Sequence, residues 1–166
     1  MERYKLKHDM KKILFAFVLL LACAACNLNK SAGAKVENGS VVEEVAFEVA
    51  QNYFFKNGQE IPASPKITTE EEFNKLFGMA TTMGENGKPT PIDFNKQFVL
   101  AIVLPVTDMA TEIVPVKVEA LGDTLRYAYN VKVGEKQSFT IQPLSLIVLD
   151  KQYENSQVLL VNEPQE

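Results

Sequence analysis

Hydrophobic and polar positions alternate along most of the second half of the chain, and this period of two is typical of half-buried β-strands. Residues 97–104 differ because they are apolar almost without interruption, so we expect both faces of that strand to be buried. Glycine-containing turns at 121–123 and 134–136 separate the later strands. The pattern predicts strands at residues 97–104, 113–120, 124–133 and 138–149, with a short edge strand at 158–161.

One segment has helical spacing instead. Phe73, Leu76 and Phe77 are three and four residues apart, which places them on one face of a helix. A threonine at 68 or 69 precedes a glutamate by three residues, as in a capping box, and Gly78 follows as a stop signal. The pattern predicts a helix over about 69–78 whose apolar stripe faces the core.

The first half of the chain is less regular. Val45, Phe47 and Val49 alternate with polar or small residues and favour a strand within 41–55, although Glu43, Glu44 and Ala50 are also compatible with a helix. Residues 79–95 hold several glycines and prolines and indicate a long loop. The later hairpins follow one another with no helix between them, which indicates an antiparallel sheet. The predicted fold class is α+β: a single domain with an antiparallel β-sheet of about five or six strands and one packed helix.

The N-terminus carries a targeting signal. Lys11 and Lys12 precede an apolar run at 13–22, which is shorter than the roughly 20 residues of a membrane span and typical of a secretory signal peptide. Small residues and two cysteines follow, and the segment resembles the lipobox of bacterial lipoproteins, where a cysteine at the cleavage site is lipidated. Cys26 is the expected lipidation site and Cys23 the alternative. An ordinary signal peptide cleaved just before position 26 is a third possibility.

This resemblance implies three parts: a lipoprotein signal peptide with its anchor cysteine at 1–26, a flexible tether at 27–40 and an α+β domain at 41–166. The tether is small and polar in composition. No acidic residue directly follows Cys26, which favours a lipid-anchored location in the cell envelope, in the outer membrane and facing the periplasm.

The charge of the processed chain limits its partners. The leader takes five basic and two acidic residues from totals of 17 and 21, which leaves 12 and 19, a net charge of about −7. Nucleic-acid binding needs a basic surface that displaces counterions, so we expect no nucleic-acid partner. Attraction to anionic lipid is also disfavoured, so the expected membrane contact is the N-terminal lipid itself.

Residue types exclude most catalytic chemistry. The single histidine, His8, and both cysteines lie in the leader or at its end, and tryptophan is absent. Histidine-dependent triads, Cys–His catalysis and His/Cys zinc sites are therefore excluded from the processed domain. All-carboxylate catalysis, a Ser–Lys pair near Ser138 or Ser145, and an oxygen-ligand cation site remain open. We expect no enzyme activity, no catalytic residue, no cofactor and no metal.

The segment 105–112 joins two expected core strands and carries an apolar Met109, expected to be exposed, between polar neighbours. It is either an ordinary connection or a loop that presents a partner-binding edge. The candidate partner-binding residues are Thr107, Asp108, Met109 and Thr111.

The order of elements over residues 65–150 resembles the C-terminal domain of PrcB, a protease-associated subunit, and small lipoproteins of Bacteroides-type bacteria. The matching features are Ile67-Thr68-Thr69-Glu70-Glu71-Glu72-Phe73 at the helix start, Ile92-Asp93-Phe94-Asn95-Lys96, the buried strand from Phe98 to Leu104, and Pro143-Leu144-Ser145-Leu146-Ile147-Val148. The PrcB-like glycine-rich segment after the buried strand is replaced here by Leu104-Pro105-Val106 and Thr111-Glu112. The resemblance implies a non-catalytic binding domain that accompanies or restrains a protease.

The sequence therefore predicts a lipid-anchored cell-envelope protein whose domain binds another envelope protein. The alternative is a carbohydrate- or small-ligand-binding envelope module that uses Tyr127, Tyr129 or Tyr153 as stacking surfaces. An all-carboxylate glycosidase is a third hypothesis, and it requires two inward carboxylates roughly 5–10 Å apart in a cleft.

Overall fold

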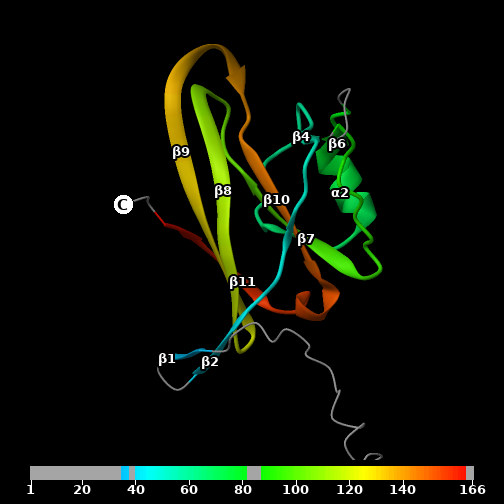
Figure 1. Cartoon of the computed structure of the whole chain (residues 1–166). Coiled ribbons are helices and arrows are strands. Elements are labelled where there is room, and N and C mark those ends of the chain that lie inside the picture. Colours follow the sequence, from blue (N-terminus) through cyan, green and yellow to red (C-terminus); the bar gives the residue numbers. More distant parts are fainter. Residues whose placement is uncertain (1–34, 38–39, 82–86, 164–166) are drawn as a thin grey trace, which may run out of the picture. The chain divides into compact units, whose positions relative to one another are not determined.

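The computed structural model describes residues 35–37, 40–81 and 87–163, and residues Ala32–Glu166 form one compact unit (Figure 1). The described residues form one α-helix, one short 3₁₀ helix and strands in three sheets. The helices are α2 (Glu70–Leu76) and η1 (Lys151–Tyr153). The strands are β1 (Lys35–Glu37), β2 (Ser40–Glu44), β3 (Glu48–Val49), β4 (Tyr53–Phe55), β5 (Lys66–Ile67), β6 (Phe77–Met79), β7 (Gln97–Val103), β8 (Thr107–Leu121), β9 (Thr124–Ile141), β10 (Leu144–Asp150) and β11 (Gln157–Asn162).

The predicted single sheet is wrong, although the sheets are mainly antiparallel as expected. One sheet has the order β1-β2-β8-β9-β11, a second has the order β3-β10-β7-β5, and β4 pairs with β6 in a third. The strands are also more numerous than the sequence predicts. Residues 157–162 form the expected short strand at a sheet edge, but β11 runs parallel to β9 because η1 and the following turn redirect the chain.

The longest strands form one hairpin that folds back on itself. β8 and β9 pair from Leu121 opposite Thr124, beside a turn in which Gly122 has φ +56°, to Thr107 opposite Ile141. The same two chain segments continue as β7 and β10, which pair from Val103 opposite Leu144 onward. We call the place where the hairpin folds, residues 104–109 and 133–143, the corner. In Figure 1 it is the bend by which β9 passes over into β10.

The fold of the hairpin produces the core. Alternate residues of β7 and β10 face two different hydrophobic clusters, so both faces of these strands are buried, as the apolar run at 97–104 predicts. Facing the β8–β9 sheet are Phe98, Leu100, Ile102, Ile147 and Leu149, packed against Ile113, Val118, Leu125 and Tyr127. Facing α2 are Val99, Ala101, Val103, Leu146 and Val148.

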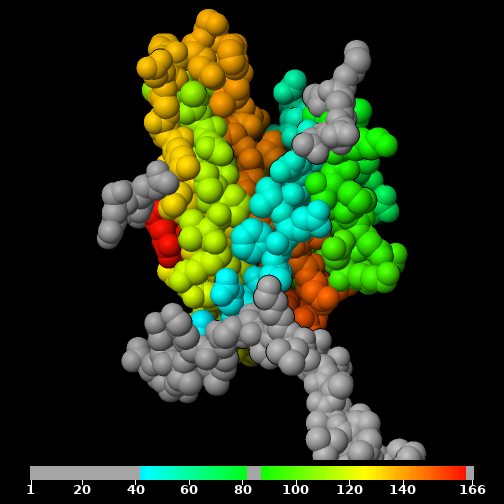
Figure 2. Space-filling model, viewed as in Figure 1, coloured from blue at the N-terminus to red at the C-terminus, as the bar shows by residue number. Residues whose placement is uncertain are grey.

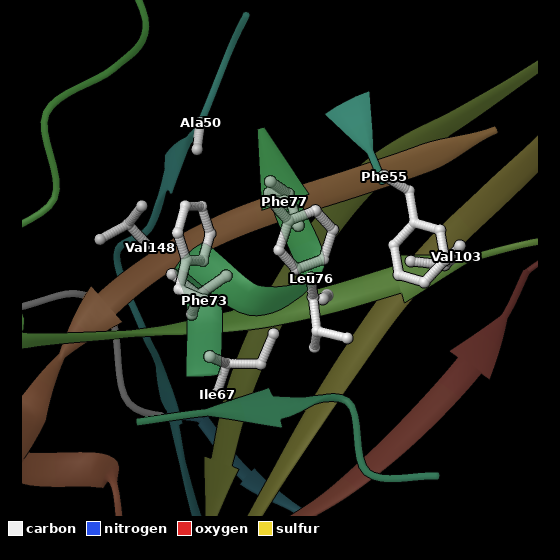
Figure 3. Packing of buried hydrophobic residues seen from close by; sticks show 11 residues of the cluster. Ala50, Phe55, Ile67, Phe73, Leu76, Phe77, Val103 and Val148 are labelled. Carbon is white, nitrogen blue, oxygen red and sulfur yellow. The ribbon is translucent and has the colours of Figure 1, made fainter. Parts of the chain in front are cut away.

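Helix α2 confirms most of the predicted helix. The Thr69 hydroxyl oxygen accepts a hydrogen bond from the Glu72 backbone N–H at 3.2 Å, and Phe73, Leu76 and Phe77 are buried against Ile67 and Val148 (Figure 3). The helix ends at Leu76, before the predicted stop, because Phe77 is extended and begins β6.

The predicted strand within 41–55 is divided into β2, β3 and β4, which belong to three different sheets. Val45 is buried, but Val49 is 40% exposed. Asn52 has φ +63°, a left-handed conformation that a continuous strand does not contain. The alternation of Val45, Phe47 and Val49 therefore reflects a chain that crosses between sheets.

One predicted connection is also wrong. Gly134-Glu135-Lys136 is not a turn, because β9 continues through it opposite β8, and a Cβ at Gly134 would lie 3.3 Å from the Ala110 Cβ. The predicted strand at 138–149 is divided near Pro143 instead. Within the residues predicted as a tether, 27–40, lie β1 and the first residue of β2. These two strands pair with each other, and Glu37 lies opposite Ser40.

Candidate functional site

The corner is the candidate site, because the predicted partner-binding residues lie there or in the adjoining part of β8. Thr107, Asp108, Met109 and Thr111 all lie in β8, so the predicted loop is a strand. Within this segment the register of β8 with β9 shifts twice, between Thr107 and Met109 and between Met109 and Thr111. Such bulges kink a strand and redirect its side chains. Figure 2 shows this end of β8 and β9 on the visible surface, in yellow-green and orange, with no other coloured segment in front of it.

Hydrogen bonds hold this irregular segment in place. The Met109 N–H donates to the Thr107 hydroxyl oxygen at 3.1 Å, and the Thr111 hydroxyl donates to the Met109 carbonyl oxygen at 3.1 Å. Asp108 forms an ion pair with Lys136 of β9 at 2.9 Å. Met109 is half-buried, so the expectation of an exposed methionine is wrong. These contacts keep the backbone groups at the bulges satisfied.

The exposed apolar side chains of the corner are different from those that the sequence singles out. Val106 is 61% exposed, Val133 is 62% exposed and Phe139 is 58% exposed. Large apolar side chains left in water are candidates for contact with a partner. Sequence patterning does not reveal them. The alternation within the predicted strand 124–133 places Val133 on the same face as Leu125, Tyr127 and Tyr129, and so predicts a buried side chain.

The same part of the hairpin is incompletely paired. The ladder between β11 and β9 ends where the Glu163 N–H donates to the Tyr129 carbonyl oxygen at 2.8 Å. Beyond it, no described strand pairs with the outer edge of β9 at residues 130–141. Two buried acceptors on this segment, Asn130 Oδ1 and Gln137 Oε1, have no donor among the described residues. Open edges and unsatisfied acceptors suit contact with another polypeptide.

The tyrosines expected to stack on a ligand are not equally available. Tyr127 is fully buried, and its hydroxyl lies 3.5 Å from the Ser145 hydroxyl oxygen. Burial raises the pKa of Tyr127 to about 12. Tyr127 is therefore a core residue, and its assignment as a stacking surface is wrong. Tyr129 and Tyr153 are half-buried beside the same cluster.

A charged network covers the outer face of the β8–β9 sheet. Arg126 pairs with Glu119 and with Glu163, both at 2.8 Å, and Lys117 pairs with Glu119 at 2.9 Å. The hydrogen bond from Lys117 and the one from Arg126 lower the pKa of Glu119 against the opposing effect of burial. The alternate positive and negative charges neutralise one another, which is typical of a solvated sheet face.

Acidic residues come together at one place in the described fold. A hollow of about 520 Å³ is lined by the carboxylates of Glu48, Asp93 and Asp150. The pKa of Asp93 is lowered, first by the hydrogen bond from the Asn95 backbone, which is the opposite of what a general acid needs. In the described ranges no group of three or more His, Cys, Asp or Glu residues is placed to hold a metal ion. Ser145, one of the serines considered for a Ser–Lys pair, is buried.

The predicted lipidation sites, Cys26 and Cys23, lie outside the described residues. Across residues 35–37, 40–81 and 87–163, no helix has the length and apolar character needed to cross a membrane. No family model, no curated protein and no solved structure matches this chain.

Proposed function

We propose that this chain is a lipid-anchored cell-envelope protein whose domain binds another envelope protein and performs no catalysis. The leader sequence supports the anchor, and the absence of histidine and cysteine after position 26 supports a binding role. The resemblance to the PrcB C-terminal domain makes a protease the leading class of partner.

The observation that carries the proposal is the corner. Val106, Val133 and Phe139 are exposed on a ribbon whose outer edge pairs with no described strand, and the same ribbon carries the ion pair of Asp108 with Lys136. Apolar anchors beside charged groups are typical of protein interfaces. In this proposal Thr107, Asp108, Met109 and Thr111 shape the surface, and the exposed side chains make the main contacts.

Co-purification from detergent-solubilised envelope tests the proposal. A reproducible partner should be recovered with the unaltered chain and lost with F139D or V133D. The matched control is L159D, because Leu159 is 53% exposed but lies on β11, away from the corner. Equal recovery with all four proteins, or no partner at several salt concentrations, would contradict the assignment.

The anchor is tested separately. C26A should release the protein from membranes and abolish incorporation of labelled palmitate, whereas C23A should do neither. Incorporation that persists in C26A and disappears in C23A would reverse the assignment. The alternative of a carbohydrate-binding module now rests on Tyr129 and Tyr153 alone, and saturable binding on a glycan array would favour it over protein binding.

A further inference from the structure

A second candidate site lies beside α2. It is on the side of the β3-β10-β7-β5 sheet that faces away from β8 and β9. There the surface has an open cavity of about 430 Å³, which is within the range of small-molecule sites. Its wall includes the rings of Tyr53, Phe73 and Phe94, together with Met79 and Ile92. The lining is mainly apolar, and it shares no residue with the corner.

The aromatic rings hold fixed positions relative to one another. The rings of Tyr53 and Phe73 meet edge to face, with centroids 5.1 Å apart and an interplanar angle of 86°. Phe73 and Phe94 are tilted, with centroids 5.5 Å apart. Phe73 itself is buried in the core, so the innermost ring cannot move without disturbing α2. The cavity therefore presents preformed aromatic surfaces.

Hydrogen bonds tie the outer wall to the strand beside it. The Tyr53 hydroxyl donates to the Thr90 carbonyl oxygen at 2.7 Å, and the Asn52 side-chain amide donates to the Lys88 carbonyl oxygen at 2.8 Å. The Thr90 N–H also donates to the Gln51 carbonyl oxygen at 3.2 Å. These bonds join residues almost 40 positions apart in the sequence and hold the segment that carries Lys88 against the cavity.

Two opposite charges line the cavity from different segments. Glu70 begins α2, and Lys88 belongs to the tied outer wall. Both side chains are exposed, and neither forms an ion pair with another described residue. An apolar cavity lined by one carboxylate and one ammonium group complements a ligand that has an apolar group, a positive charge and a negative charge.

We propose that this cavity binds a free hydrophobic amino acid. The side chain, aromatic or branched aliphatic, packs in the hollow against Phe94 and Ile92. The ligand ammonium group pairs with Glu70 and the ligand carboxylate with Lys88. The amino acid residue within a peptide carries neither charge, so the two charged side chains select the free form.

Titration of the full chain with L-phenylalanine tests the proposal, observed by NMR at the methyl groups of Met79 and Ile92. Saturable shifts at both methyls are expected, and E70Q and K88Q should each weaken binding about fivefold to tenfold. M79W should abolish the shift at Ile92 by filling the cavity. L159W, which places the same ring on β11, should leave it unchanged.

Comparison ligands separate the proposed class from others. Phenylacetate and benzylamine each lack one charge and should bind more weakly than phenylalanine. N-acetyl-L-phenylalaninamide, a model of a residue within a peptide, should bind most weakly of the three. Equal binding of this amide and of phenylalanine would overturn the proposal in favour of a peptide site. The absence of a saturable shift up to about 10 mM would overturn it outright.

Discussion

Two halves of the same hairpin have opposite characters. In the β7–β10 half, every residue from Phe98 to Val103 is buried, and the two faces serve two different clusters. In the β8–β9 half, the part of β9 that leads into the corner, residues 132–140, is exposed except for half-buried Gln137. The outer edge of this part pairs with no described strand. Paired strands of one hairpin therefore differ strongly in burial, and the proposed binding surface lies in the exposed part.

The largest expected effect is the difference in the free energy of unfolding between a substitution in one half and a substitution in the other. Replacing Phe98 by alanine removes a fully buried ring and should lower the free energy of unfolding by about 3–5 kcal/mol. F139A should change it by less than about 0.5 kcal/mol, because Phe139 is mostly in water already. Urea unfolding of both variants measures this. Similar losses in the two variants would contradict the division of the hairpin.

Alkaline pH should weaken the core through Tyr127. Because the folded protein holds the pKa of this phenol at about 12 against an ordinary 10, the folded state retains a proton that the unfolded state loses between these values. The contribution of Tyr127 is fully present below pH 10 and is lost as pH rises to about 12, by roughly 3 kcal/mol in total. Urea midpoints measured across this range should fall less steeply in Y127F. An unchanged slope would show that Tyr127 does not resist ionisation.

Acid should weaken the charged face of the β8–β9 sheet by a smaller amount. The pKa of Glu119 is lowered in the folded state, so its contribution is present above the ordinary value of 4.5 and is lost as pH falls through the folded pKa. E119Q should remove this acid dependence and lower stability at neutral pH by about 1 kcal/mol or less, because the network is partly exposed. Unfolding curves between neutral and acidic pH test this. A variant that keeps the full acid dependence would exclude Glu119 as its source.

The smallest expected effect is at the corner ion pair. Asp108 and Lys136 are 43% and 73% exposed, so K136Q should alter the free energy of unfolding by less than about 0.5 kcal/mol. The same variant should nevertheless weaken partner capture if the corner is the interface. A large loss of stability would instead make the ion pair a structural element of the fold.

The parts of the fold that the sequence predicts correctly depend on local patterns or on burial. The run Phe98–Leu104 indicates burial on both faces whatever it packs against, and Thr69 caps α2 through contacts within one turn. The errors come from long-range pairing. Gly134 resembles a turn glycine, but the β8–β9 register places it against Ala110, where a small residue fits. Only that register distinguishes the two roles.

The candidate site, like the fold, could be predicted from the sequence only in part. The sequence singled out an irregular part of β8, where two register shifts occur. The predicted residues there are Thr107, Asp108, Met109 and Thr111. The exposed positions Val133 and Phe139 were not predicted. In the sequence Val133 continues the inward alternation of Leu125, Tyr127 and Tyr129. Bulges in a strand reverse which face a side chain occupies, and their positions depend on the partner strand.

Site-specific photo-crosslinking in intact cells tests most directly whether the corner is the binding surface. A photoreactive phenylalanine analogue at position 139 should join the protein to one discrete envelope partner, whereas the same analogue at position 159 on β11 should not. Equal crosslinking at both positions, or none at 139 in a folded and membrane-attached protein, would contradict the account.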